Sequence, residues 1–254
     1  MMSAVDNGWQ RSAGAWIADQ GERGDFGRRY VLDPVMVPRA LARSPTRALD
    51  VGCGEGRFCR LLAPHRVDVV GIDPTPALIA AARARDRGGV YLQATAERLP
   101  FGDATFDLVV SYLSLIDIPD IQSAISEMAR VLTPGGALLI ANLNSFSTAC
   151  GDQGWFKDGG GRRLHYPIDH YLQERPMWLE YRGIRVVNHH RPMRTYVSTL
   201  LGAGLVLNYF DEPSPTAEAP AARAHAYRRV PWFLVMEWLT PAVTIARQRV
   251  EVPG

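Results

Sequence analysis

The feature that most constrains this chain is an alternation of two patterns between Thr46 and Asn144. Short runs of β-branched and aliphatic residues, typical of buried strands, take turns with stretches whose apolar residues recur at helical spacing. This alternation predicts βαβ units, in which helices connect the parallel strands of an α/β sheet. The predicted strands are RALDV (47–51), VDVVGI (67–72), VYLQA (90–94), FDLVVS (106–111) and GALLIANL (136–143).

Two of the connecting helices have clear start signals. Thr75 is a plausible N-cap for a helix over 76–85, and Pro76 then stands at the first helical position, where its missing N–H costs nothing. The second helix runs over 121–132 behind Asp120 and is stopped by the sequence TPGG. The apolar stripes of both helices are predicted to be core.

Composition and charge exclude several classes of protein. The 254 residues are 47% hydrophobic and 21% charged, which is typical of a folded globular chain. The net charge of +2 is spread along the whole length, so no basic footprint for nucleic acid or an anionic membrane is expected. Three scattered cysteines favour a reducing compartment, and no apolar run approaches the roughly 18 residues of a membrane span. We expect a cytoplasmic protein.

The rest of the chain divides around this core. Residues 1–45 are predicted to be an N-terminal helical segment, and residues 46–254 one domain with an insertion at about 145–192. The insertion is irregular and Gly-rich, with a hairpin expected about Gly159 to Gly161.

Regular patterns return after the insertion. A short helix is predicted at 194–201, followed by a strand at 204–210, a Pro- and Ala-rich loop at 212–224 and a closing strand at 231–238. Two late strands joined by a long loop predict an antiparallel edge on the sheet.

The loop in ALDVGCGEGRF (48–58) has the form of a nucleotide-binding turn between a strand and a helix. A dinucleotide fingerprint requires the spacing G-x-G-x-x-G, which Gly52, Gly54 and Gly56 do not have. Asp50 would also repel a pyrophosphate. A carboxylate there suits a ligand with positive charge, such as a sulfonium and an ammonium, and an NAD-dependent oxidoreductase is accordingly disfavoured.

The sequence LDVGCGEG resembles the first motif of class I S-adenosylmethionine-dependent methyltransferases. Further pieces follow in the order of that family: GIDPTP, ATAERLPF, FDLVVS and VLTPGGALLI. The resemblance covers roughly 46–144 and implies a Rossmann-like, doubly wound sheet of seven strands with an antiparallel edge strand. It also implies that the ligand lies at the carboxyl ends of the strands.

The resemblance assigns cofactor contacts residue by residue. Asp73 would accept hydrogen bonds from the ribose hydroxyls, and the glycines would let the backbone approach the methionine portion. Thr95 stands where the family often has an aspartate, although its hydroxyl can still accept a hydrogen bond from the adenine amine. The implied cofactor residues are Asp50, Gly52, Cys53, Gly54, Asp73, Pro74, Thr95, Ala96, Glu97, Ser111 and Tyr112.

The acceptor is expected to be a small molecule. The end of the fourth strand, SYLSLIDIPD, lacks the Asn/Asp-Pro-Pro-aromatic tetrad with which related enzymes grip an amine of a nucleic-acid base or a glutamine. The N-terminal segment and the insertion are then predicted to close over the site as a lid and a substrate cap. Aromatic cover for the sheet edge is an equally good interpretation of these aromatic residues. The candidate lid and substrate residues are Trp9, Trp16, Tyr30, Leu115 and Tyr166.

Histidines in the insertion are the candidates for a catalytic base. His165 and His170 are the two chosen, since a base is needed only where the acceptor must lose a proton. No metal site is predicted, because Asp117 and Asp120 only vaguely resemble a carboxylate ligand set.

We therefore expect an enzyme that transfers a methyl group from S-adenosylmethionine to a nitrogen or oxygen of a small molecule, possibly a secondary metabolite, by in-line displacement. The alternative is a methyltransferase-like binding or regulatory protein without catalysis. No nucleic-acid or membrane partner is expected. Association of this chain into a homo-oligomer is left as an open alternative.

Overall fold

A computed structural model describes residues 6–151 and 154–242. The outer parts of the predicted segments, at 1–5 and 243–254, and residues 152–153 of the predicted insertion lie outside the described residues. Seven strands form one sheet in the order β10-β11-β5-β4-β1-β2-β3. Its strands are β1 (Arg47–Val51), β2 (Asp68–Asp73), β3 (Val90–Gln93), β4 (Phe106–Tyr112), β5 (Leu132–Leu143), β10 (Val206–Asp211) and β11 (Phe233–Leu239).

The pairing of these strands confirms the predicted sheet. β1 pairs in parallel with β2 and β4, and β4 pairs in parallel with β5. β11 is antiparallel to both of its neighbours, β5 and β10, so the late hairpin makes the antiparallel edge. The carboxyl ends of β1, β2, β4 and β5 consequently meet along one rim of the sheet.

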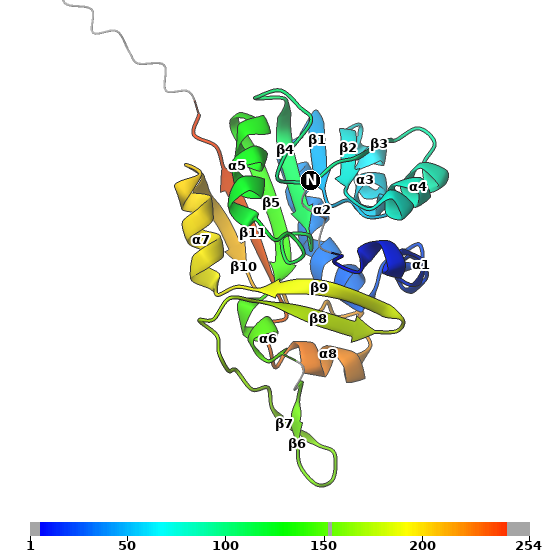
Figure 1. Cartoon of the computed structure of the whole chain (residues 1–254), viewed down its shortest axis with the longest axis vertical. Coiled ribbons are helices and arrows are strands. Elements are labelled where there is room, and N and C mark those ends of the chain that lie inside the picture. Colours follow the sequence, from blue (N-terminus) through cyan, green and yellow to red (C-terminus); the bar gives the residue numbers. More distant parts are fainter. Residues whose placement is uncertain (1–5, 152–153, 243–254) are drawn as a thin grey trace, which may run out of the picture.

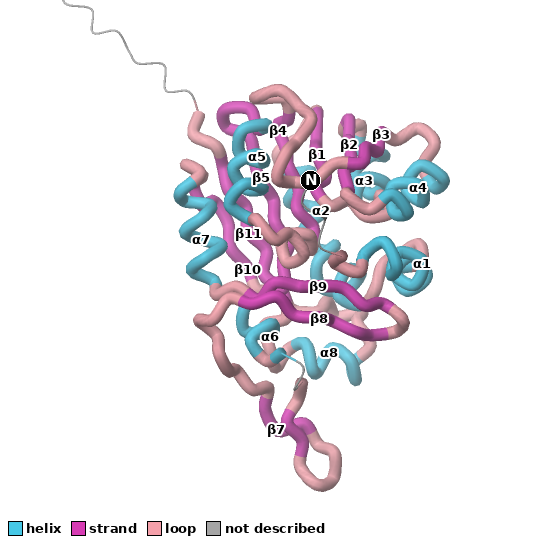
Figure 2. Tube along the Cα trace, in the orientation of Figure 1, coloured by secondary structure: helices cyan, strands magenta, loops and turns pink. Residues whose placement is uncertain are grey.

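Helices cover both faces of the sheet, as Figure 2 shows. On one face, Met36, Leu62 and Ile79 pack with Ala48 and Leu108 of the strands. The helices on this face are α2 (Asp33–Ala42), α3 (Arg57–Leu62), followed by the 3₁₀ turn η2 (Ala63–His65), and α4 (Pro76–Arg85).

The opposite face carries α5 (Ile121–Val131) and α7 (Met193–Gly202). Ile125 and Leu200 from these helices pack there against Leu49 and Val109. Neighbouring residues of one strand, such as Ala48 and Leu49, thus point into different cores, as a buried strand requires.

The helix starts agree with the sequence. Thr75 has an extended N-cap backbone before α4, although its side chain makes no capping bond. Asp120 caps α5 by accepting from the Ser123 amide, at 3.0 Å between Oδ1 and N.

The N-terminal segment and the insertion lie at the carboxyl-end rim. Helix α1 (Trp9–Gln20) packs against β9 and α4, and a π-helix, η1 (Arg28–Leu32), leads from it towards α2. The insertion contains α6 (Ser145–Ala149), the short β6 (Phe156–Lys157) and β7 (Arg163–His165), and the longer β8 (Arg175–Tyr181) and β9 (Ile184–His190). In Figure 1 the β8–β9 hairpin lies across the lower ends of β4 and β5, beside α1.

Two parts of this region differ from the sequence predictions. The β6–β7 hairpin turns at Gly161 as expected, but β8–β9 was not predicted. Part of the predicted loop 212–224 is helical, because α8 (Ala221–Tyr227) begins after Pro220 and buries Ala224 and Ala226. Among the residues that the structure describes, no helix has the length and apolar character needed to cross a membrane.

Candidate functional site: the glycine loop and its lid

The loop after β1 has the backbone of a tight ligand cradle. Gly52, Gly54 and Gly56 all have positive φ, at 76°, 57° and 78°. A Cβ on Gly52 would lie 2.4 Å from the Ser114 Cβ, so the loop passes too close to the segment after β4 for any side chain. The amides of Gly52 and Cys53 both donate to the Ile72 carbonyl at 2.8 Å, which fixes the loop against β2.

Asp50 is a buried carboxyl beneath this loop, with 1% of its surface exposed. The Cys59 thiol donates to its Oδ2 at 3.4 Å, whereas Oδ1 is buried without a hydrogen-bond partner. Burial raises the pKa of Asp50 to about 7. By contrast the buried Glu55 carboxylate pairs with Arg60 and Arg85, at 2.5 and 2.8 Å. Asp50 is therefore the loop carboxyl that a cationic ligand group would stabilise.

Asp73 connects the end of β2 to the loop. Its Oδ2 accepts from the Gly54 amide at 3.1 Å and its Oδ1 from the Thr75 amide at 2.8 Å. Burial raises the pKa of this carboxyl even against these two donors. Asp73 is thus held rigidly at the carboxyl end of β2, with one edge of the loop bonded to it.

A hollow lies over the loop, with a cavity volume of about 50 Å³, or about 390 Å³ when the space open to solvent is included. We call it the cofactor hollow. Its walls come from the loop and α3, from the end of β4 and from the N-terminal segment. The lining residues are Asp50, Gly52, Cys53, Gly54, Glu55, Arg57, Phe58, Tyr112, Trp16, Gln20 and Arg28.

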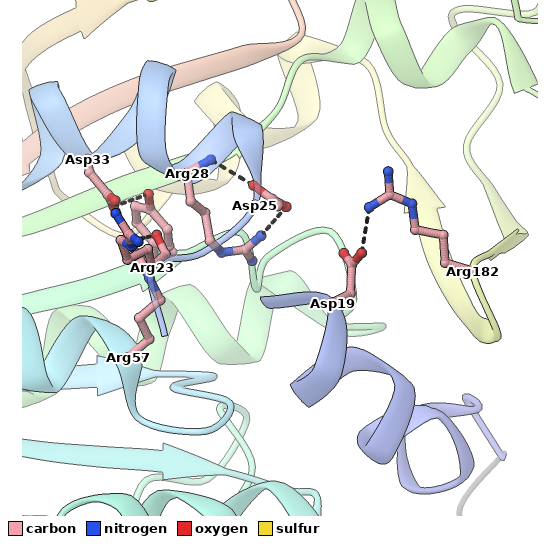
Figure 3. A network of polar contacts seen from close by, with 8 residues as sticks. Asp19, Arg23, Asp25, Arg28, Asp33, Arg57 and Arg182 are labelled. Carbon is pink, nitrogen blue, oxygen red and sulfur yellow. Dashed lines mark hydrogen bonds and ion pairs between the residues drawn. The ribbon is translucent and has the colours of Figure 1, made fainter. Parts of the chain in front are cut away.

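Arg28 brings a guanidinium to this hollow from the N-terminal segment. It pairs with Asp25 at 2.9 Å and lies over the rings of Trp16 and Tyr112, at 4.8 and 5.7 Å from their centroids. Figure 3 shows this pair beside a second one, in which Arg57 binds Asp33.

The second pair fixes the wall of the hollow. Arg57 also donates to the Arg23 carbonyl at 2.8 Å, and the Tyr112 hydroxyl donates to Asp33 at 2.8 Å. Tyr112 additionally stacks on Phe58, with centroids 5.0 Å apart. The sequence did not predict Arg28 and Arg57 as site residues, because their positions depend on how the N-terminal segment folds over the loop.

Other predicted cofactor residues, Asp73 among them, lie outside the lining of the hollow. Pro74 and Thr95 are exposed, and Ala96 and Glu97 follow Thr95 in the turn after β3. Ser111 is fully buried, with its hydroxyl 2.7 Å from that of Ser114. Their predicted contacts with adenine and with the ligand ammonium remain predictions.

The predicted lid residues separate into three groups. Trp16 lines the hollow and meets Trp9 edge to face at 5.1 Å between centroids. Tyr30 instead packs on Phe26, at 5.2 Å. Leu115 is fully buried in the core, so its side chain is a packing residue and not a part of the hollow.

The two histidines that were predicted as catalytic bases lie outside the lining of the cofactor hollow. His165 is an exposed residue of β7 that stacks on Phe156 at 4.8 Å, on a hairpin that projects from the molecule (Figure 1). His170 is exposed in a turn, with Nε2 3.6 Å from an Asp169 oxygen. Neither lines the cofactor hollow, because the chain between β6 and β8 runs away from the rim. Tyr166 donates to the Ser147 carbonyl at 3.2 Å and is also outside the lining.

The β8–β9 hairpin, which we call the cap hairpin, bonds to a different titratable group at the rim. Asp117, in the segment after β4, accepts a hydrogen bond from Asn188 of β9, at 2.6 Å between Oδ1 and Nδ2. Burial raises the pKa of Asp117 to about 8, with Asn188 and Trp9 opposing the shift and the charge of Asp73 adding to it. Asp117 therefore lies at the same rim of the sheet as the glycine loop and Asp73, although it does not line the cofactor hollow.

The hairpin is fastened to the same segment by further bonds. Arg191 donates to the carbonyls of Ile118 and Pro119 at 2.7 and 2.8 Å, and the His189 amide donates to the Ile116 carbonyl at 2.7 Å. Within the described residues no three His, Cys, Asp or Glu side chains come together as metal ligands.

Comparison with known proteins agrees with this geometry. A family model described as a methyltransferase domain matches residues 49–140. The chain is similar to malonyl-[acyl-carrier protein] O-methyltransferase of Enterobacter lignolyticus, at 34% identity over 50% of this chain and 51% of that protein. It is also similar to demethylmenaquinone methyltransferase of Deinococcus radiodurans, at 35% identity over 54% of this chain and 49% of that protein. The chain thus spans about half the length of these curated relatives.

This chain matches one solved structure over nearly the whole length of that structure. The crystal structure of an S-adenosylmethionine-dependent methyltransferase from Mesorhizobium loti superposes with a TM-score of 0.68 at 30% identity, covering 81% of this chain and 99% of that one. Since the seven-stranded sheet, the glycine loop and this similarity agree, the chain belongs to the class I methyltransferases, enzymes whose cofactor is S-adenosylmethionine.

Proposed function

We propose that the protein transfers the methyl group of S-adenosylmethionine to an oxygen or nitrogen of a small molecule, and that Asp117 accepts the proton that this acceptor loses. One observation carries the proposal. Asn188 of β9 donates a hydrogen bond to Asp117, which lies in the segment after β4. This segment is on the rim where the glycine loop and Asp73 also lie. A proton acceptor and a cofactor cradle then lie on the same rim of the sheet.

The residues of the cofactor hollow fit the group. The sulfonium of S-adenosylmethionine supplies an electrophilic methyl carbon when the cofactor is bound. Asp50, with its unpartnered Oδ1, would stabilise the positive end of the ligand, and Asp73 would accept from the ribose hydroxyls. Arg28 would pair with the ligand carboxylate.

The environment of Asp117 suits general-base catalysis. A base works best when its pKa lies near the working pH, and burial raises the pKa of Asp117 to about 8. The hydrogen bond from Asn188 to Oδ1 fixes the orientation of the carboxyl. The remaining contribution of the chain is to position the acceptor in line with the methyl carbon.

The relatives support small-molecule chemistry without fixing the acceptor. One is named as a malonyl-[acyl-carrier protein] O-methyltransferase and the other as a demethylmenaquinone methyltransferase. The different acceptors named for these two relatives are consistent with an acceptor site built by segments outside residues 49–140, which the family model matches. We accordingly assign the lid to residues 1–45 and the acceptor cap to 145–192.

Methyl transfer is tested with S-adenosylmethionine and a panel of phenols, carboxylic acids and amines, using mass spectrometry of the products. For an acceptor that loses a proton, Asp117→Asn should lower turnover by about 10²- to 10⁴-fold. Turnover of the wild type should rise with pH through about 8, where Asp117 ionises. Asp120→Asn is the matched control, because Asp120 only caps α5.

Calorimetric titration with S-adenosylhomocysteine separates the outcomes. We expect Asp117→Asn to keep the cofactor affinity within about twofold, since the variant leaves the glycine loop intact. Tight cofactor binding with no transfer to any acceptor would instead favour a methyltransferase-like binding protein. Equal turnover of the Asp117→Asn and Asp120→Asn variants would remove Asp117 from the chemistry.

A further inference from the structure

A second hollow lies below the cap hairpin and shares no lining residue with the cofactor hollow. It measures about 630 Å³, which is in the range of small-molecule sites in proteins. We call it the arginine–tryptophan hollow, after the residues that carry the argument: Trp155, Trp232, Tyr227, Arg163, Arg182 and Arg223.

Its aromatic walls are held by stacked neighbours. Tyr166 bridges Trp155 and Trp232, with centroids 5.4 and 5.2 Å away, and Trp232 contacts Tyr227 at 5.6 Å. These rings are half-buried, so each has one side packed and another open. Aromatic faces of this kind stack on planar apolar groups.

Its charged groups are all positive. Three arginines and no carboxylate line the hollow. Arg182 is neutralised by Asp19, at 2.6 Å, as Figure 3 shows. Arg163 and Arg223 have no carboxylate within 4.0 Å in the described part of the chain, and they lie over the rings of Trp155 and Phe26 instead.

A further arginine fixes the strand that carries Arg163. Arg229 donates to the carbonyls of Arg163 and Leu164 at 2.9 and 2.6 Å, and its guanidinium lies 4.5 Å from the Trp155 ring centroid. The backbone of β7 is therefore tied to the segment before β11. The hollow is a built feature and not a gap beside an untethered hairpin.

From these contacts we infer that the arginine–tryptophan hollow binds a small ligand with a planar apolar body and a carboxylate or phosphate group. The rings would take the planar body, and Arg163 and Arg223 would bind the anion, for which guanidinium is the fitting donor. A concave site of this volume suits a small molecule better than a flat protein surface would.

The test is calorimetric titration with 2-naphthoate in saturating S-adenosylhomocysteine, so that the cofactor hollow is filled. We expect 2-naphthoate to bind at least about tenfold more tightly than 2-naphthylmethylammonium, which has a similar body and the opposite charge. The double variant Arg163→Gln/Arg223→Gln should weaken naphthoate binding about tenfold or more. Arg162→Gln/Arg228→Gln is the control, because it removes the same charge from neighbouring exposed positions.

A second variant acts without a change of charge. Ala222 lines the hollow from the exposed side of α8, so Ala222→Trp should fill the hollow and abolish binding while α8 still forms. The inference is overturned if naphthoate does not bind, if the ammonium probe binds equally well, or if the control variant weakens binding as much as the test variant. Because the readout is binding and not methyl transfer, its failure leaves the proposed function standing.

Discussion

Asn188 of β9 and Asp117 of the segment after β4 are joined by a hydrogen bond of 2.6 Å between residues 71 positions apart. The bond connects the β8–β9 hairpin to the rim of the sheet at the carboxyl ends of its parallel strands. It is supported by Arg191, whose guanidinium binds three carbonyls of residues 115–119. The cap hairpin is therefore a fixed part of the site.

The first prediction concerns the pH dependence of stability. Burial raises the pKa of Asp117 in the folded chain to about 8, far above the ordinary value of 3.8. Between about pH 4 and pH 8 the folded state therefore keeps the Asp117 proton, whereas the unfolded state releases it. The stability that this protonated carboxyl contributes is complete below about pH 4 and is lost as the pH rises to about 8. In Asp117→Asn the midpoint of thermal unfolding should fall less between pH 5 and pH 8.5 than in the wild type.

Asp120→Asn serves as the control here also. An equal fall of the unfolding midpoint in the Asp117→Asn variant and in the wild type would mean that Asp117 is already ionised at pH 5.

The sequence predicted the centre of the sheet well because β1, β2, β4 and β5 are buried on both faces and read as apolar runs. The strands of the cap hairpin lack such a signal. In β9, Ile184 and Val186 alternate with exposed residues as a half-buried strand should, but the next inward positions are Asn188 and His190. Polar residues occupy these positions because Asn188 binds Asp117 and the His190 ring lies 2.7 Å from the Thr148 hydroxyl.

The site was predictable to the extent that it lies on one continuous motif. Asp50, Gly52 and Gly54 line the cofactor hollow because they are neighbours at the end of β1 and in the loop that follows it. Arg28 and Asp117 come from distant segments, and their roles depend on tertiary contacts that no local pattern encodes. The histidines were favoured because they gather in the insertion, and the structure places His165 on the β6–β7 hairpin and His170 in an exposed turn, both outside the lining of the cofactor hollow.

The second prediction concerns the charge of Asp50. Its pKa is raised to about 7 by burial, and a cationic ligand favours the ionised form. The affinity for S-adenosylmethionine should therefore rise as the pH increases from 6 to 8. Calorimetry at three pH values should show this rise in the wild type and not in Asp50→Asn. A rise of the same size in the variant would assign the effect to another group.

The third prediction tests Asp73. Asp73→Ala removes the acceptor of the Gly54 and Thr75 amides together with the predicted ribose contact, so affinity for S-adenosylhomocysteine should fall about tenfold or more. Asp68→Ala, at the exposed start of the same strand, should leave the affinity unchanged. Unchanged affinity in both variants would exclude Asp73 from the ligand site.

The fourth prediction compares two glycines. Gly52→Ala combines a positive φ with a Cβ 2.4 Å from Ser114, so we expect a loss of more than about 2 kcal/mol in the free energy of unfolding. Gly14→Ala in the middle of α1 meets no atom within 4 Å and should stabilise the protein by about 0.5–1 kcal/mol. Urea unfolding measures both, and a Gly52→Ala variant as stable as the wild type would show that the loop can move away from Ser114.

The last prediction assigns the end of the ligand that meets Arg28. The guanidinium is positioned by Asp25 and by the rings of Trp16 and Tyr112, and it lines the cofactor hollow. If it binds the carboxylate of the methionine portion, Arg28→Met should weaken S-adenosylhomocysteine binding about tenfold. Binding of 5′-methylthioadenosine, which lacks that carboxylate, should hardly change.

Arg29→Met is the matched control, because Arg29 is exposed and does not line the hollow. Equal weakening of both ligands by Arg28→Met would mean that Arg28 shapes the hollow through Trp16 and Tyr112 and does not contact the carboxylate. Separate effects on the two ligands would fix the orientation of the cofactor, with its methionine end towards the lid and its ribose at Asp73.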